Sequence, residues 1–488
     1  MSESEHKRNN ATEPEVPATS RTLSRREFLK VAGVAGAAVG VGAGFGGLIA
    51  ACGGEAETTT TTGAATTSTA ATGTTVGATT TTSAEAETGR EIKIGWVTPL
   101  TGPLASFGVP DKYCAERWAE AVADGLVCGD TKNHKISIIT KDSQSDGNRA
   151  AQVAGDLINN DKVDIVLVAS TPDTVNPVAD QAEALGTPCL SNDCPWQPYF
   201  FGRGGDPAVG FKWTYHTFWG AEDFIATVNS MFQAIPTNKV VGALWPNDAD
   251  GNAFRPAWTP FLAENGYKLI DPGAYQNGTE DFTQQISQFK AAGCELLTGV
   301  VIPPDMTNFW KQAAQQGWVP KVCSVGKALL FPQSVEAMGP IGNGLATELW
   351  WHKDFPFKSS LTGETCAELA ADFEKREGIE WTAPLLHYIV FEMAVDTLKR
   401  ATSVDDKEAI IAAVRSMKFD SIGGPVDFSS PVAEGSLHPV PNVSKTPLAG
   451  AQWLMLGGKW PFEEIIVDNT QAPMVTVQQP LKALPITA

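Results

Sequence analysis

The strongest constraint on the fold is an alternation of strand and helix patterns that begins at Glu91. Residues 92–97 form a short apolar run with β-branched residues, which predicts a buried strand. A turn at Gly102-Pro103 follows, and residues 107–124 have helical spacing of their apolar side chains. A strand, a turn and a helix open an α/β sheet, and ligands of such sheets bind beyond the carboxyl ends of the strands, where this turn lies.

The alternation continues in two blocks, which predicts two lobes, each a parallel sheet with helices on both faces. In the first block, strands are predicted at 134–139, 163–169 and 188–191, and helices at 148–160 and 174–185. An aromatic stretch without clear period, 195–219, separates the blocks. In the second block, helices are predicted at 221–234, 254–265, 282–292 and 306–316, and strands at 239–245, 267–270, 296–302 and 321–325. Three helices (365–377, 385–401 and 405–416) and two antiparallel strands (452–456 and 461–467) follow.

The first residues are typical of an export signal. Ser24 to Lys30, S-R-R-E-F-L-K, resembles the twin-arginine export motif, and an uncharged Gly/Ala-rich stretch follows. The segment ends in L-I-A-A-C, which resembles a bacterial lipobox with Cys52 as the lipid attachment residue. Residues 1–51 are therefore expected to be a lipoprotein signal peptide, with a transmembrane helix as the alternative. Residues 52–90 are Thr-rich and of low complexity, which predicts a disordered tether.

Composition excludes several classes of function. A net charge of −19 opposes nucleic-acid binding, which requires a basic face. The sequence contains no G-x-S-x-G elbow, Walker loop or H-E-x-x-H motif, and its six His are scattered. We therefore expect no enzyme, no metal and no cofactor. Seven cysteines follow Cys52, and structural disulfides are expected among them outside the cytoplasm. The candidate pairs are Cys189–Cys194, Cys114–Cys128 and Cys294–Cys323.

A more specific signal lies in residues 101–108, T-G-P-L-A-S-F-G. This segment resembles the first ligand loop of ABC-transporter substrate-binding proteins of the branched-chain amino acid group, and the resemblance extends from Glu91 to about Gln471. It implies the type I periplasmic binding protein fold, with three hinge crossovers between two lobes. It also implies a small-molecule ligand, delivery to an ABC importer permease and a location on the outer face of the cell membrane. We expect a monomer held to the membrane by its lipid anchor.

The resemblance implies lobe 1 at 91–220 with 348–445, and lobe 2 at 221–347 with 446–488. It also implies positions for the ligand. In the family, a Ser/Thr loop at the place of Ser170-Thr171 holds the ligand carboxylate; the alternative is a helix N-cap. An aromatic at Phe107 packs on the ligand. The other loop positions implied to contact it are Asp193, Cys194, Asp250 and Ile302.

Two features depart from the family pattern. The family commonly has an acid that pairs a ligand amino group, whereas this chain has Lys327 there. Either another acid takes that role, with Asp193 and Asp250 among the candidates, or the ligand is no simple amino acid. Trp219 ends the aromatic stretch and is either core or a wall of the pocket. We expect a ligand whose carboxylate lies at Ser170-Thr171 and whose second acceptor group faces Lys327. The alternatives in function are a ligand-sensing domain that signals to a membrane receptor and a secreted enzyme.

Overall fold

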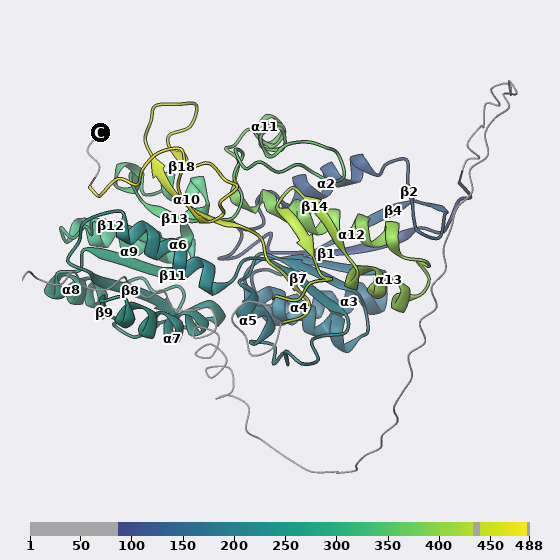
Figure 1. Ribbon diagram of the computed structural model, residues 1–488, viewed down its shortest axis with the longest axis horizontal. Helices are drawn as coiled ribbons and strands as arrows, with labels where there is room; N and C mark the ends of the chain where they lie inside the picture. The colour runs from purple at the N-terminus through teal and green to yellow at the C-terminus, as the bar shows by residue number, and fades with distance from the viewer. Residues whose placement is uncertain (1–85, 433–439, 486–488) are drawn as a thin grey trace, which may run out of the picture.

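The computed structural model describes residues 86–432 and 440–485. Two α/β lobes lie side by side, one built mainly from residues 92–217 and the other mainly from residues 221–349 (Figure 1). The predicted signal peptide, its Cys52 and nearly all of the predicted tether lie outside the described residues. Within the described residues, no helix has the length and apolar character needed to cross a membrane.

The sheet of the first lobe contains six strands, and all of its pairings are parallel. In spatial order they are β16 (Val443–Ser444), β7 (Thr214–Thr217), β6 (Cys189–Asn192), β5 (Ile165–Ala169), β1 (Ile92–Thr98) and β4 (Ile136–Asp142). The helices α2 (Asp111–Ala121) and α12 (Tyr388–Arg400) pack on one face, and α3 (Gly147–Asp156) and α4 (Pro172–Ala184) on the other. Coverage of both faces explains why β5 is buried throughout.

The sheet of the second lobe contains eight strands. In spatial order they are β10 (Ala274–Tyr275), β8 (Val240–Pro246), β11 (Leu296–Val301), β12 (Val322–Lys327), β13 (Ala346–Leu349), β17 (Leu448–Leu454) and β18 (Glu463–Gln471), while β9 (Lys268–Ile270) also pairs with β8. The pairings are parallel up to β13 and antiparallel from there to β18. On one face lie α6 (Ala221–Gln233) and α7 (Ala249–Glu264); α8 (Thr283–Ala292) and α9 (Pro303–Gln315) cover the other.

The remaining elements are short or lie at the edges. They include α5 (Trp196–Phe200), α10 (Pro332–Glu336), α11 (Cys366–Glu377), α13 (Lys407–Arg415) and two small hairpins, β2 (Leu126–Val127) with β3 (Asn133–His134) and β14 (Lys418–Ser421) with β15 (Gly424–Asp427). Four short 3-10 or π helices of the described residues belong here as well: η1 (Leu157–Asp161), η2 (Ala328–Leu330), η3 (Gly339–Gly342) and η4 (Ala383–His387).

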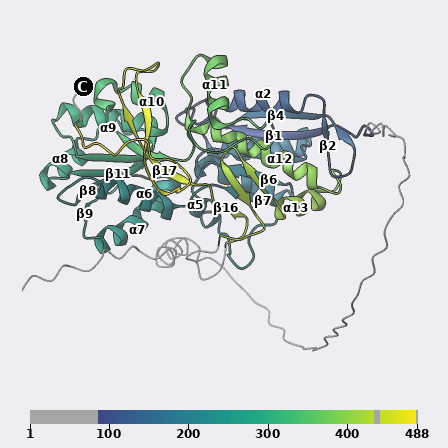
Figure 2. The same cartoon turned by 45° about the horizontal axis from the view of Figure 1, so that its top comes forward.

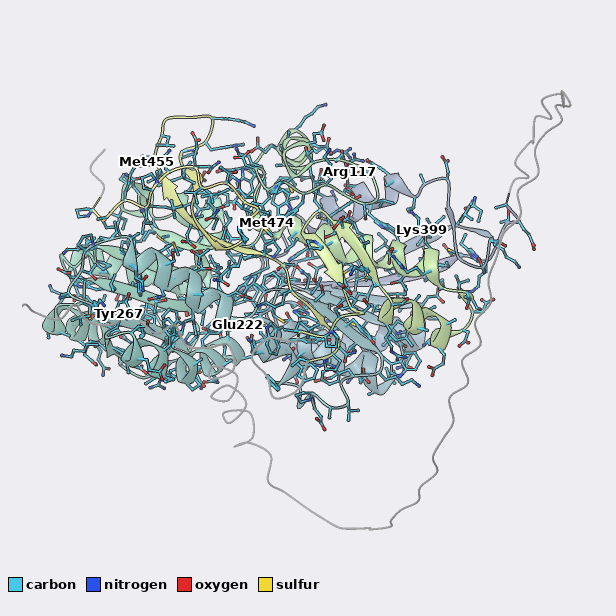
Figure 3. The ribbon with its side chains drawn as sticks, viewed as in Figure 1. Arg117, Glu222, Tyr267, Lys399, Met455 and Met474 are labelled. Carbon is cyan, nitrogen blue, oxygen red and sulfur yellow. The ribbon has the colours of Figure 1, made fainter. Side chains whose placement is uncertain are left out.

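The chain passes between the two sheets three times: after β7, after β13 and between β16 and β17 (Figure 2). An ion-pair cluster ties the first and third crossovers together, because Lys445 Nζ lies 2.7 Å from Glu222 Oε1 and 2.5 Å from Asp223 Oδ2. Glu222 lies where the two lobes meet (Figure 3). The predicted two-lobe α/β fold with three crossovers is confirmed.

Two predicted helix starts were misplaced. The first helix begins at Asp111 and not at residue 107, since the turns of residues 102–110 end in Pro110, which lacks a backbone N–H. The second-lobe helix predicted from residue 254 begins at Ala249, because Asp248 caps it by accepting from Gly251 N at 2.8 Å. Asp250 therefore lies in the first turn of a helix.

The expected disulfides are wrong in this structure. All seven cysteines of the described chain, Cys114, Cys128, Cys189, Cys194, Cys294, Cys323 and Cys366, are free thiols, and all are buried. Free cysteine packs as a small apolar residue, and here each thiol fills space in the core without a partner sulfur.

Candidate functional site

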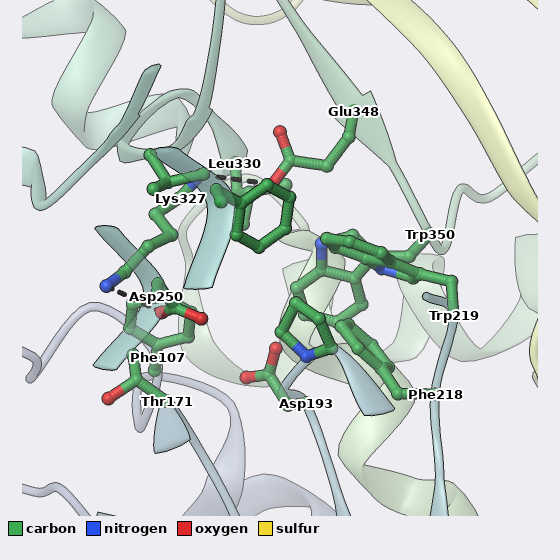
Figure 4. A pocket seen from close by; sticks show the side chains of 13 residues that line it. Phe107, Thr171, Asp193, Phe218, Trp219, Asp250, Lys327, Leu330, Glu348 and Trp350 are labelled. Carbon is green, nitrogen blue, oxygen red and sulfur yellow. Dashed lines mark hydrogen bonds and ion pairs between the residues drawn. The ribbon is translucent and has the colours of Figure 1, made fainter. Parts of the chain in front are cut away.

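A cleft lies between the lobes at the carboxyl ends of the parallel strands of both sheets (Figure 4). Its open space amounts to about 330 Å³, the solvent at its mouth included. The side chains that line it are Phe107, Thr171, Asp193, Pro195, Phe218, Trp219, Asp250, Phe254, Val300, Lys327, Leu330, Glu348 and Trp350. This is where the alternation of strands and helices predicted a ligand.

The turn between β5 and α4 presents two unused hydroxyls. Ser170 and Thr171 are 1% and 2% exposed, and neither Ser170 Oγ nor Thr171 Oγ1 has a hydrogen-bond partner. Thr171 occupies the N-cap position of α4, but its side chain does not cap the helix. A buried hydroxyl without a partner costs about 1–3 kcal/mol. Two such hydroxyls beside the positive end of a helix form a natural cradle for a carboxylate.

Asp193 follows the end of β6, and its carboxylate is hydrogen-bonded to His387. His387 Nε2 lies 2.8 Å from Asp193 Oδ2, and His387 Nδ1 lies 2.7 Å from Asp111 Oδ1. Burial disfavours the charged ring, but the two carboxylates outweigh it and raise the pKa of His387 to about 9. Burial raises the pKa of Asp193 to about 6, against the pull of His387. Both ring nitrogens are engaged with carboxylates, so this histidine has no free nitrogen to act as a general base.

Lys327 ends β12 with its ammonium paired inside the protein. Its Nζ lies 2.8 Å from Asp250 Oδ2 and 3.2 Å from Asp248 Oδ2. Burial disfavours the ammonium, but Asp248, Asp250 and Asp173 outweigh it, so the pKa of Lys327 lies above its usual value. Its φ of +66° is rare for a residue with a side chain, and such strain concentrates at functional sites. Because the ammonium already contacts two carboxylates, a bond from Lys327 to a ligand anion would have to use its remaining N–H or compete with Asp248 and Asp250.

Sequence reasoning missed Glu348, which lies in β13. Its Oε1 accepts from Lys327 N at 3.0 Å, and its Oε2 accepts from Thr347 Oγ1 at 2.7 Å. Burial raises the pKa of Glu348 to about 7, against the bond from Lys327 N. Gly326 leaves room for the carboxyl, since a Cβ there would lie 3.0 Å from both carboxylate oxygens. The only sequence signal for Glu348 is a position near the end of a strand, and the sequence pattern does not predict this strand.

Aromatic side chains form much of the cleft wall. Phe107 and Trp219 both line it, together with Phe218 and Trp350. Phe107 packs edge-on against Phe331 with 4.9 Å between ring centroids. The indole Nε1 atoms of Trp219 and Trp350 are buried and have no hydrogen-bond partner, so they add two donors to the wall. The aromatic stretch therefore serves both core and pocket.

Three of the residues implied to contact a ligand do not line the cleft. Ser170 directly precedes the lining residue Thr171 but is not itself a lining residue. Cys194 is buried, with its Sγ 3.8 Å from His216 Nε2. Ile302 caps α9, and Val300 lines the cleft in its place, because α9 begins directly after β11 with no intervening loop. Among the described residues, no cluster of His, Cys, Asp and Glu is arranged to hold a metal ion.

Comparison with known proteins agrees with this geometry. A family model described as periplasmic binding protein matches residues 91–437, and a model of the twin-arginine translocation signal sequence matches residues 22–42. Leu/Ile/Val-binding protein homolog 7 of Brucella abortus is 22% identical over 266 residues, 52% of this chain. The chain spans 63% of the length of that relative.

Solved structures with a similar fold include a leucine-binding protein from Thermotoga maritima, with 17% identity, a TM-score of 0.62 and coverage of 77% of this chain and 98% of the other. A second is a solute-binding protein from Rhodopseudomonas palustris in complex with 3,4-dihydroxybenzoic acid, with 18% identity, a TM-score of 0.62 and coverage of 78% and 98%. At such identities these structures show the fold alone. Because the family match covers most of the sequence, the chain belongs to the periplasmic binding protein family.

Proposed function

We propose that this protein captures a small carboxylate-bearing solute between its two lobes and delivers it to an ABC importer. The observation that carries the proposal is the unpartnered buried hydroxyl of Thr171, which lines the cleft at the N-terminus of α4. The hydroxyl of the preceding residue, Ser170, is buried and unpartnered as well. A carboxylate there removes the cost of two unused hydroxyls and gains charge-assisted bonds of about 1.5–3 kcal/mol each.

The relatives support this class of ligand. Their names refer to leucine, isoleucine and valine, and one structure contains 3,4-dihydroxybenzoic acid. All of these molecules bear a carboxyl group, and each has an apolar or flat body that suits the walls formed by Phe107 and Trp219. A ligand that contacts both lobes binds the closed form better than the open form, and so shifts the population toward closure.

A ligand screen tests the proposal. We expect at least one of leucine, isoleucine, benzoate and 3,4-dihydroxybenzoate to raise the melting temperature, since a ligand that binds only the folded state stabilises it by mass action. Thr171→Val should weaken binding of that ligand, whereas Ser416→Ala, at the end of α13 and outside the cleft, should not. Absence of any shift from all four acids contradicts the proposal.

The proposal includes the division of the chain and its anchor. Lobe 1 would comprise residues 91–220 and 348–445, and lobe 2 residues 221–347 and 446–488. The twin-arginine match supports export, and lipid attachment at Cys52 would keep the protein at the membrane. Cys52→Ser should move the protein from the membrane fraction to the soluble exported fraction. A variant that stays with the membrane would show that another segment anchors the chain.

A further inference from the structure

Two loops of the first lobe lie against each other beyond the carboxyl ends of β1 and β4. Residues 99–110 join β1 to α2 and carry Phe107, whose side chain belongs to the cleft wall (Figure 4). Residues 142–145, which we call the clamp turn, end β4 and lead toward α3, and none of them lines the cleft. The clamp turn can therefore act on a ligand only through other residues.

The carboxylate of Asp142 binds the start of the loop that carries Phe107. Its Oδ1 accepts from Leu100 N at 3.0 Å and from Thr101 N at 3.3 Å, and its Oδ2 accepts from Thr101 Oγ1 at 2.6 Å. Oδ1 also accepts from Gln144 N at 2.8 Å, within the clamp turn itself. One carboxylate thus holds both loops, and hydrogen bonds to an ionised acceptor are among the stronger ones in proteins.

Ser145 connects the clamp turn to Phe107 in two steps. Its Oγ accepts from Leu104 N at 3.0 Å and donates to Thr101 O at 2.6 Å. Leu104 O in turn accepts from Phe107 N at 3.0 Å. The Phe107 ring meets Phe331 of the second lobe edge-on, with 4.9 Å between ring centroids. Hydrogen bonds therefore lead from Ser145 to a ring of the cleft wall.

The backbone of the clamp turn is strained. Gln144 and Ser145 have φ values of +54° and +57°, a region that residues with a side chain seldom adopt. Gly102 faces them at a φ of +93°, and a Cβ there would lie 2.6 Å from Ser145 Oγ and 2.8 Å from Gln144 O. Directly after the turn, Asp146 caps α3 and fixes the exit of the chain. Such strain persists only where the surroundings enforce it, and it concentrates at functional sites.

We propose that the clamp turn sets the ligand affinity of the cleft by fixing Phe107 in the position that a ligand meets. Asp142 and Ser145 are positioning residues, because they touch the loop and not the ligand. A loop that is ordered before the ligand arrives has no ordering cost left at binding, so a larger fraction of the protein is competent to bind. The inference rests on the proposed function, since it concerns the affinity of that same cleft.

Binding kinetics test the proposal, because loss of positioning and loss of a ligand contact change different rates. Ser145→Ala lowers the fraction of protein with Phe107 in place, so we expect the association rate to fall about tenfold and the dissociation rate to stay within about twofold of wild type. Thr171→Val removes a hydroxyl of the wall itself and should raise the dissociation rate. Stopped-flow measurements with leucine, isoleucine, benzoate and 3,4-dihydroxybenzoate give both rates for each acid that binds.

Substitutions of Asp142 separate its hydrogen bonds from its charge. Asp142→Asn keeps an oxygen for the same three backbone N–H groups, so its association rate should stay close to that of the wild type. Asp142→Ala loses these bonds and should associate as slowly as Ser145→Ala. Ser429→Ala is the control, because Ser429 Oγ donates to Asp427 Oδ1 at 2.6 Å in another exposed turn, outside the cleft. It should leave both rates unchanged.

Hydrogen exchange measures the loop without a ligand. The amides of Leu104 and Phe107 should exchange faster in Ser145→Ala than in the wild type, while the amides of β1 keep their protection. Unchanged exchange at these two amides overturns the proposal. If Ser145→Ala does not fold, the same comparison between Asp142→Ala and Asp142→Asn decides.

The rates separate this inference from the function on which it rests. Wild-type binding with equal association rates in Ser145→Ala, Asp142→Ala and the wild type overturns the inference alone, as does a loss of affinity that lies entirely in the dissociation rate. If the wild type binds none of the four acids, the proposed function and this inference are both overturned.

Discussion

The two walls of the cleft differ in whether their polar side chains have partners within the protein. On the first-lobe wall, Ser170 Oγ and Thr171 Oγ1 are buried without partners. On the second-lobe wall, Lys327 is bonded to Asp248 and Asp250. The one ammonium among the lining side chains is therefore paired within the protein, whereas the two small hydroxyls have no partner in it. A buried polar group without a protein partner is the better marker of a ligand contact.

The largest effect should come from removing the paired charge on the second wall. Lys327→Met leaves Asp248 and Asp250 buried without their cation, which costs about 3–5 kcal/mol of unfolding free energy. Urea denaturation at pH 7.5 measures it, and the loss should shrink at pH 5, where protonation of the two carboxyls removes their repulsion.

The matched control is Lys112→Met, an exposed lysine whose pair with Glu116 is worth at most about 1 kcal/mol. A Lys327→Met protein that is as stable as the wild type but has lost its ligand would reverse the contrast between the walls. The lysine would then be a ligand residue.

The charge of His387, which pairs with Asp193 and Asp111, should make the stability of the protein depend on pH. The pKa of His387 is raised from 6.5 to about 9 in the folded state, so its contribution is complete below pH 6.5 and is lost as the pH rises through 9. At about 1.4 kcal/mol per unit the full shift corresponds to about 3 kcal/mol. Urea denaturation from pH 6.5 to 9.5 should show this decline in the wild type and a flatter curve for His387→Gln.

His352→Gln is the control for this prediction. Burial lowers the pKa of His352 to about 4, so that residue is already neutral throughout the window and the variant should keep the wild-type slope. Equal slopes in all three proteins would show that His387 carries no charge at neutral pH.

A smaller effect is expected from the unpaired hydroxyls of the first wall. Ser170→Ala and Thr171→Val should each reduce the affinity for a carboxylate ligand by about ten- to a hundredfold. This loss is equivalent to one charge-assisted hydrogen bond. Neither should lower stability in the absence of ligand, because each removes a buried group that has no partner. Calorimetry and urea denaturation of the same samples separate the two readings. Loss of stability without loss of affinity would assign the hydroxyls to the fold.

The smallest effect concerns a contact that joins the walls. Asp173 Oδ1 accepts from Ala249 N at 3.4 Å, across the cleft from α4 to α7. At this length the bond is weak, so Asp173→Asn should change ligand affinity less than about threefold, or about 0.6 kcal/mol. Stopped-flow dissociation of the ligand measures it. A tenfold change would make this contact a main latch of the closed form.

The fold was predictable because the spacing of apolar residues along the chain shows which side chains are buried. The apolar run in β5 and the alternation of strands and helices placed both sheets, and the break at 195–219 marked the boundary between blocks. The errors fell where a local bond overrides the apolar pattern, as at the Asp248 cap of α7. The expected disulfides failed because cysteine spacing says nothing about whether two sulfurs meet.

The site was predictable only as far as the strand ends were. Thr171, Asp193, Asp250 and Lys327 follow or adjoin predicted strands, and the structure brings their side chains to one cleft. Glu348 could not be found in this way, because β13 was not predicted. The pairing of Lys327 could not be found either, since it depends on the approach of α7 in three dimensions. Sequence identifies charged residues, and only packing shows which of them are already neutralised.

The most direct test of the whole account is a crystal structure of the protein with the tightest acid from the screen. The account predicts closed lobes, with a carboxylate oxygen of the ligand within hydrogen-bond distance of Ser170 Oγ and Thr171 Oγ1, while Lys327 Nζ stays bonded to Asp250. A ligand whose carboxylate is bound by Lys327, with Ser170 and Thr171 still unpartnered, would contradict it.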